Sequence, residues 1–114
     1  MAIRKNPSQI EETGNPIILN FIRQFTNNGK WDQVIESFTC GNCYYFALIL
    51  KNRFPEGEII YNAVENHFAY QLDQNAYDIS GTIHLSDSWH NWDAYFDIDS
   101  IHAERIKRYC IDIV

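Results

Sequence analysis

Basic residues are missing from a long central stretch of the sequence. No lysine or arginine occurs over residues 54–104, which hold ten acidic residues. The whole chain of 114 residues has nine Lys and Arg against 15 Asp and Glu, a net charge of −6. A charge-driven binder of nucleic acid or anionic membrane needs clustered Lys and Arg, so the composition argues against both as partners. We expect a solvated acidic surface, or a field that attracts a basic partner.

Long apolar runs are absent as well. The longest run, residues 44–50, is too short to cross a membrane, and residues 1–16 contain no run of signal-peptide length. We therefore expect a cytoplasmic protein. It has three cysteines, an odd number, and the cytosol keeps thiols reduced. Chemistry or packing is expected to explain them better than disulfides.

The remaining composition is that of one globular domain. Hydrophobic residues make up 46% of the chain and aromatic residues 15%, too much for a disordered protein. We divide this domain into an N-terminal helical part (1–40), a core (41–81) and a covering segment (82–114).

Helix signals fill the first half of the sequence. Ser8 opens a capping box, and Asn15-Pro16 starts an amphipathic helix over residues 16–26. The Asn-Asn-Gly run at 27–29 ends that helix, and residues 31–36 add a further turn or two.

A second, mostly buried helix is predicted over Cys43–Arg53. Asn42 can cap its start, and Pro55 requires it to end, because the residue before a proline disfavours the helical region. Cys43 therefore lies on the first turn of a helix.

Strand signals follow that helix and predict an α+β fold with a small antiparallel sheet. Residues 59–64 are rich in β-formers, and His67–Leu72 and residues 76–80 form a hairpin around the turn at 73–75. The C-terminal predictions are a loop over residues 86–93, a short helix over Ser100–Ile106 and a closing strand over residues 109–114.

Three residues in this framework form a possible catalytic constellation. The N-terminus of a helix lowers the pKa of the Cys43 thiol, and its free backbone N–H groups can stabilise an oxyanion. His67 opens a strand and can accept the thiol proton. Asp78 lies on the return strand of the hairpin, where it can hold the other nitrogen of the imidazole. The order Cys, His, Asp is that of a nucleophile, a base and an orienting acid.

The segments GNCYYFALIL and NHFAYQLDQNAYDISG resemble the papain-like fold of cysteine hydrolases and transferases. The pattern is closest to the small transglutaminase-like and cell-wall-amidase-like branches. This resemblance covers residues 41–81 and implies Cys43 as nucleophile, His67 as general base and acid, and Asp78 as orienter. It implies hydrolysis or transfer at an amide of a protein or small molecule through an acyl-enzyme, with no cofactor and no metal.

The sequence departs from this family at the oxyanion donor. Many papain-like enzymes have a glutamine a few residues before the cysteine, whereas the nearest glutamine in this chain is Gln33. Gln33, Asn42 or the backbone alone can serve. Trp89 and Trp92 are expected to cover the sheet or to line the substrate groove.

Several alternatives stay open at this point. Cys40 and Cys43 have CxxC spacing, which also occurs in redox dithiols and zinc sites. His84 is a rival base to His67. An inert papain-like module that docks a basic partner, such as an inhibitor or adaptor, is the alternative function. The remaining residues available to a zinc site are Cys110, His84, His90 and His102.

Overall fold

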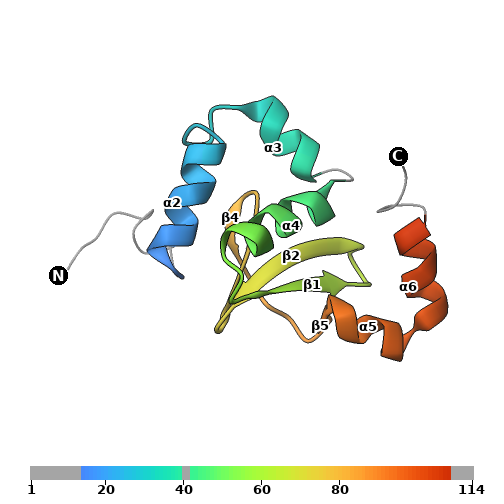
Figure 1. Ribbon diagram of the computed structural model, residues 1–114. Helices are drawn as coiled ribbons and strands as arrows, with labels where there is room; N and C mark the ends of the chain where they lie inside the picture. The colour runs from blue at the N-terminus through green and yellow to red at the C-terminus, as the bar shows by residue number, and fades with distance from the viewer. Residues whose placement is uncertain (1–13, 40–41, 109–114) are drawn as a thin grey trace.

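The computed structural model describes residues 14–39 and 42–108, with five helices and a five-stranded antiparallel sheet in these ranges (Figure 1). The helices are α2 (Pro16–Phe25), α3 (Asp32–Thr39), α4 (Cys43–Arg53), α5 (Trp92–Ile98) and α6 (Ser100–Ile106). The strands are β1 (Glu58–Asn62), β2 (His67–Leu72), β3 (Asn75–Asp78), β4 (Gly81–Ile83) and β5 (Trp89–Asn91). The predicted α+β class is confirmed, including the helix that opens with Cys43 and packs on the sheet.

The sheet has the strand order β4-β3-β2-β1-β5, so β2 lies at its centre. One face carries buried aromatic residues, since Tyr61 pairs with Phe68 and Tyr70 with Tyr77. Helix α4 covers this face, with Phe46 and Leu50 packed among the residues of α2 and the central strands. The cysteine helix is therefore held by the most buried part of the molecule.

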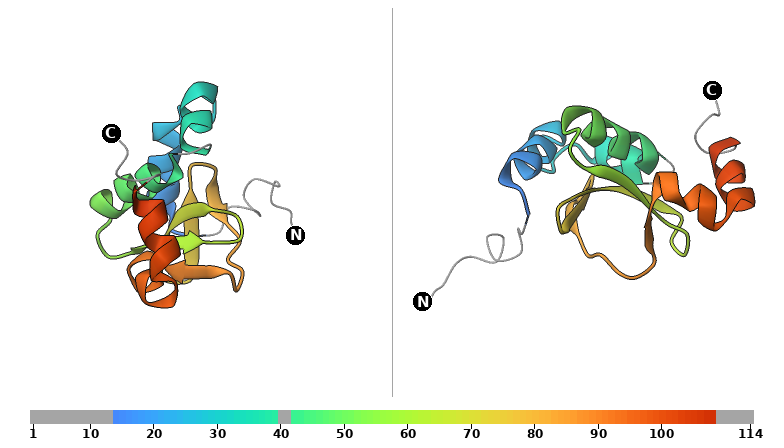
Figure 2. Two further views of the ribbon diagram at one scale, coloured as in Figure 1. Left: turned by 90° about the vertical axis from the view of Figure 1, so that its right-hand side faces the viewer. Right: turned by 60° about the horizontal axis from the view of Figure 1, so that its bottom comes forward.

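The opposite face of the sheet is narrower and is covered by the connection between β4 and β5, which crosses it in Figure 2. Ile60, Ala69 and Ala76 form a small cluster there, against which Leu85 and Trp89 pack. Side chains alternate between the two faces along a strand. His67, two residues before Ala69, consequently lies on this narrow face.

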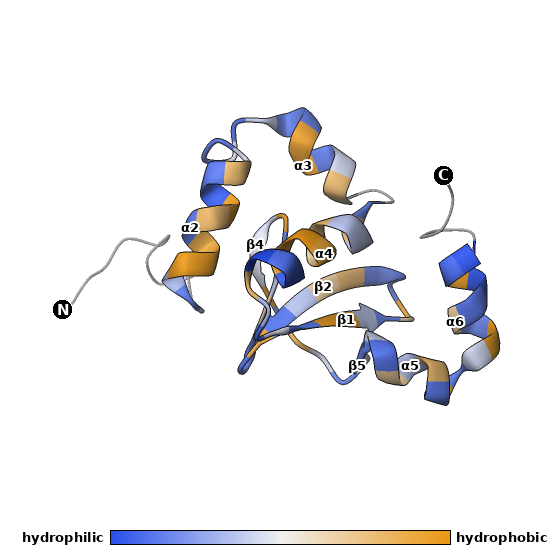
Figure 3. Cartoon of the chain, viewed as in Figure 1, coloured by the Kyte–Doolittle hydropathy of each residue, from blue (hydrophilic) through white to orange (hydrophobic). Residues whose placement is uncertain are grey.

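Helix α2 is amphipathic, and bands of hydrophobic residues recur along it in Figure 3. The Asn15 side chain accepts a hydrogen bond from the Ile17 N–H, and Pro16 occupies the first turn, as predicted. The helix ends at Phe25, and the next residues Asn27, Asn28 and Gly29 all have positive φ.

The structure corrects several boundaries. Helix α3 extends to Thr39 rather than ending at 36, and β1 ends at Asn62 rather than 64. Gly81 was predicted to end a strand, but its φ of +110° lets the chain reverse and begin β4. The predicted loop at 86–93 contains β5 and the start of α5. Ser8 and the predicted strand over 109–114 lie outside the described residues.

Within the described ranges, no helix combines the length and apolar character needed to cross a membrane.

Candidate active site

His67 and Asp78 form an ion pair at one end of the sheet. The distance from His67 Nε2 to Asp78 Oδ2 is 2.9 Å, and the two side chains are only 19% and 16% exposed. Tyr70 pairs with Tyr77, so the same register sets Asp78 opposite Ala69 and diagonally across from His67. Diagonal neighbours on one face are within reach of long side chains. The hairpin thus brings the two residues together across eleven positions of sequence.

Ser80 fixes the other oxygen of the Asp78 carboxylate. Asp78 Oδ1 accepts hydrogen bonds from the Ser80 N–H (2.8 Å) and from the Ser80 hydroxyl (2.5 Å). Both carboxylate oxygens are therefore engaged, and the group is oriented toward the imidazole. Sequence reasoning missed this role of Ser80, although a serine two residues after an aspartate is typical of an Asx-type turn.

Cys43 begins α4 and is 9% exposed. Its Sγ accepts a hydrogen bond from the Phe68 N–H at 3.5 Å, and the His67 imidazole is a hydrogen-bond partner of the same thiol. Because Nε2 of His67 is held by Asp78, Nδ1 is the nitrogen left for the sulfur. The structure thus brings Cys43, His67 and Asp78 together, and the catalytic roles assigned to them from the sequence stay a prediction.

The pKa values of these groups favour an ion pair of thiolate and imidazolium. The hydrogen bond to Asp78, followed by that to Cys43, raises the pKa of His67 to about 10. Burial raises the pKa of the Cys43 thiol, but the hydrogen bonds from His67 and Phe68 outweigh burial and lower it below its ordinary value. Burial likewise acts against the Asp78 carboxylate, whose pKa is nevertheless lowered by its bonds to His67 and Ser80. The shifts of Cys43 and His67 therefore both favour the charged pair, with Asp78 on the other side of the ring.

The start of α4 offers backbone N–H groups to an oxyanion. The Asn42 carbonyl accepts hydrogen bonds from the N–H groups of Tyr45 and Phe46. The first N–H groups of a helix point away from the carbonyls of its own turns, toward a bound oxyanion. Asn42 was predicted to cap the helix, but its side chain makes no capping hydrogen bond. Asn42 thus occupies the predicted N-cap position, but the prediction of a side-chain cap is wrong.

Gln33, the other predicted oxyanion donor, lies elsewhere. It is on the first turn of α3, exposed, and lines a separate small hollow with Trp31 and Val34. Among the described residues, no contact joins Gln33 to Cys43.

A hollow of about 460 Å³ opens beside His67 and Asp78. The Trp89 ring packs edge-on against the His67 ring, with 5.9 Å between centroids, and lines the hollow. Trp92 does not join it: this residue is 7% exposed and packs in the core against Tyr61 and Phe68. The prediction of a groove wall therefore suits Trp89, whereas Trp92 is mainly a core residue. The complete lining consists of Glu65, Asn66, His67, Asp78, Ile83, His84 and Trp89.

His84, the rival base, also lines this hollow but is exposed. The hydrogen bond to Asp78 belongs to His67. The geometry thus favours His67 over His84 as the partner of Cys43.

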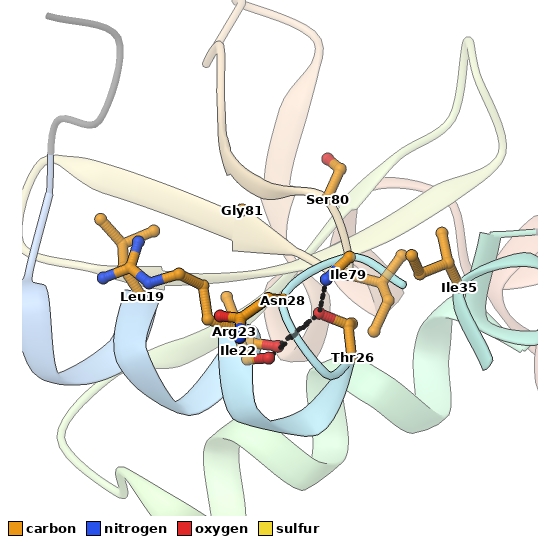
Figure 4. Close-up of a pocket in the computed structure, with 10 residues that line it drawn as sticks. Leu19, Ile22, Arg23, Thr26, Asn28, Ile35, Ile79, Ser80 and Gly81 are labelled. Carbon is orange, nitrogen blue, oxygen red and sulfur yellow. Dashed lines mark hydrogen bonds between the residues drawn. The ribbon is translucent and has the colours of Figure 1, made fainter. Parts of the chain in front are cut away.

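A second hollow, of about 400 Å³, is lined by Ser80 and Gly81 together with residues of α2 (Figure 4). Leu19, Ile22 and Ile79 give it an apolar floor, and Thr26 bonds to the backbone at its edge. It contains none of the three residues Cys43, His67 and Asp78. It touches them only through the turn that holds Asp78, so the first hollow is the better candidate for substrate.

Comparison with known proteins gives a family for the chain. A family model described as Phage YunG-like protein matches residues 18–111. The chain belongs to the Phage YunG-like family. The matched range contains Cys43, His67 and Asp78. Neither the curated proteins nor the solved structures gave a match.

The metal and redox alternatives of this YunG-like chain rest on residues beyond the described ranges. Cys40 and Cys110 lie outside them, and Cys43 is a free thiol. Within the ranges that the structure covers, no three His, Cys, Asp or Glu side chains gather in a way that could hold a metal ion. His102 donates or accepts a hydrogen bond with the Tyr95 hydroxyl at 2.7 Å, so it packs between α5 and α6.

Proposed function

We propose that this protein is a cysteine-dependent hydrolase or acyl transferase of papain-like type that acts on an amide bond. Peptidases, amidases and deamidases share this chemistry. The observation that carries the proposal is the 2.9 Å bond from His67 Nε2 to Asp78 Oδ2, which leaves Nδ1 of the ring for the Cys43 thiol. A nucleophile, a base and a group that orients the base are the minimum set for covalent catalysis.

In the proposed reaction, the Cys43 thiolate attacks the carbonyl carbon of the amide. The carbonyl oxygen becomes an oxyanion, which the backbone N–H groups at the start of α4 and the Asn42 amide can stabilise. His67 then gives its proton to the leaving nitrogen as the C–N bond breaks, which leaves a thioester on Cys43. Asp78 keeps the ring in the orientation that both transfers need.

The second half of the cycle removes the acyl group. The neutral His67 accepts a proton from water or from an amine as that molecule attacks the thioester, and the thiolate leaves. Water makes the protein a hydrolase, and an amine makes it a transferase. A reduced nucleophile suits a reducing compartment, so we also propose the cytoplasm as its location.

The test is the pH dependence of Cys43 alkylation by iodoacetamide. Because the thiolate is the reactive form, an activated Cys43 reacts well below pH ~8.5, the usual pKa of a free thiol. Fragment-ion mass spectrometry of the modified peptide separates Cys43 from Cys40. His67→Ala should move the midpoint of the profile upward, because the hydrogen bond that favours the thiolate is lost.

A matched control is His84→Ala, which removes an imidazole from the same hollow and should leave the profile unchanged. Activity on a mixture of peptide amides should disappear in Cys43→Ala. Ordinary thiol behaviour of Cys43, with no response to His67→Ala, would instead favour the inert module that docks a basic partner.

A further inference from the structure

The hollow beside His67 carries one carboxylate that the proposed reaction does not use. Glu65 lines it, together with the Trp89 ring. Among the described residues that line this hollow, none is a lysine or an arginine. The chain itself has no lysine or arginine over positions 54–104, which include every residue of the lining.

The hairpin turn between β1 and β2 holds Glu65 in position. The Asn62 side chain is 1% exposed, and its Oδ1 accepts hydrogen bonds from the N–H groups of Val64 (2.9 Å) and Glu65 (3.1 Å). The Tyr61 hydroxyl donates to Asn66 Oδ1 at 2.8 Å, which fixes the other side of the turn. The backbone that carries Glu65 is thus tied to the core, and its exposed side chain lines the hollow.

We propose that this hollow selects substrates with a cationic side chain, of the lysine or arginine type, next to the reacting amide. Glu65 is the ionic partner of the cation, and the Trp89 ring is the aromatic wall beside it. Cys43 does not line the hollow, and His67, which lines it, is the hydrogen-bond partner that joins it to the thiol. This inference rests on the proposed function, because it names a substrate class for the thiol of that reaction.

The local charges favour a cation over the other classes of substrate. An ammonium or guanidinium group meets the carboxylate of Glu65 and the electron-rich ring of Trp89, both of which attract positive charge. The positive charge of His67 is already balanced by Asp78. An anionic side chain would face the unbalanced carboxylate of Glu65 and would be repelled.

The test compares three methanethiosulfonate reagents that differ in charge: an aminoethyl, a methyl and a sulfonatoethyl reagent. In each reaction the Cys43 thiolate attacks the sulfenyl sulfur, a disulfide forms and methanesulfinate leaves. Rates at Cys43 are read in the intact chain by fragment-ion mass spectrometry. We expect the cationic reagent to react fastest and the anionic reagent slowest.

The decisive variant is Glu65→Gln. It should lower the ratio of the cationic to the anionic rate by about threefold or more, as expected for one charge several ångströms away in water. The control is Glu56→Gln, which removes the same charge from the α4–β1 connection, at the far end of β1. This control should leave the ratio unchanged.

Two results would overturn the inference: equal rates for the two charged reagents, or a ratio that Glu65→Gln does not change. The proposed function is judged separately, from the rate of the neutral methyl reagent, since intrinsic thiol reactivity cancels in the ratio. If the neutral reagent reacts at the rate of an ordinary thiol while the ratio of cationic to anionic rates still depends on Glu65, the hollow binds cations but the proposed catalysis fails.

Discussion

Asp78 uses its two carboxylate oxygens for different tasks. Oδ2 bonds to His67, and Oδ1 is held by the backbone and hydroxyl of Ser80. A carboxylate fixed on one side presents the other oxygen in one direction, so the imidazole that it holds is fixed as well. Ser80 therefore acts on His67 through Asp78 and is a positioning residue.

At this scale we expect Asp78→Asn to change the titration of His67. The bond to Asp78 is the largest cause of the raised pKa of about 10, so the pKa should fall toward the ordinary value of 6.5. NMR titration of the imidazole measures this directly, without a substrate. If the chain is an enzyme, kcat/KM should also fall by about 10²-fold or more.

The matched control is Asp73→Asn, on the exposed β2–β3 turn, where an asparagine accepts the positive φ of 58°. This substitution removes the same charge from the same hairpin and should leave the pKa of His67 unchanged. An unchanged His67 pKa in Asp78→Asn would contradict the role of Asp78 as orienter.

The three residues of the site were predictable because local signals position each of them. Asn42 and Pro55 bound the cysteine helix, and the turn at 73–74 sets the distance between His67 and Asp78 along the hairpin. The different environments of the two tryptophans could not be predicted from such local signals. Trp89 and Trp92 are three residues apart, and only the packing of α5 against Tyr61 buries the second.

Among the elements, the β1–β2 hairpin depends on one buried side chain. Asn62 is nearly inaccessible, and its amide oxygen satisfies two backbone N–H groups of the turn. The turn also contains Asn66 with a φ of 51°, a conformation that asparagine tolerates better than most residues. The shape of this turn sets where β2 begins, and β2 begins with His67.

We expect Asn62→Ala to lower the free energy of unfolding by about 1–3 kcal/mol, because two partly buried donors lose their acceptor. Urea unfolding followed by tryptophan fluorescence measures the loss. Asn52→Ala, at an exposed position of α4, is the control and should change stability by less than about 0.5 kcal/mol. Equal effects of the two substitutions would rule out this role of Asn62.

The elements that sequence reasoning missed are the short ones. β4 and β5 have three residues each, too few for an alternating pattern to stand out. Their existence depends on partners: β4 pairs with β3 after the reversal at Gly81, and β5 pairs with β1 across the sheet. Longer elements with clear ends, such as α4 and β2, were predicted with their observed bounds.

For the whole molecule, the pair of His67 and Asp78 makes stability depend on pH. The raised pKa of His67 means that the folded chain keeps a proton that the unfolded chain loses above pH 6.5, so stability falls as pH rises past that value. The lowered pKa of Asp78 acts in the other direction: the unfolded chain takes up a proton below about pH 3.8, and stability falls as pH drops.

We therefore expect the stabilisation from this pair to be greatest between pH ~4 and ~6.5. The contribution of the pair is measured by denaturant unfolding of two variants, Cys43→Ala and Cys43→Ala/His67→Gln. Both lack the thiol that is coupled to His67, so they differ only in the His67–Asp78 interaction. The difference between the two should reach about 1.5–3 kcal/mol in that window, the usual contribution of a hydrogen bond to a charged group. A difference that grew steadily as pH rose from neutral into the alkaline range would contradict the expected fall in stability.

The short span of chain that forms the site, residues 43–78, has a consequence for folding and for variation. Helix α4 and the first three strands of the chain are consecutive, so the cysteine, histidine and aspartate meet through local closures of the chain. Local contacts cost little loop entropy and form quickly. The three groups thus lie in one uninterrupted segment, to which Ser80 adds the orientation of Asp78 and α2 the packing of α4, so variation is expected to be tolerated best in the elements that contact neither.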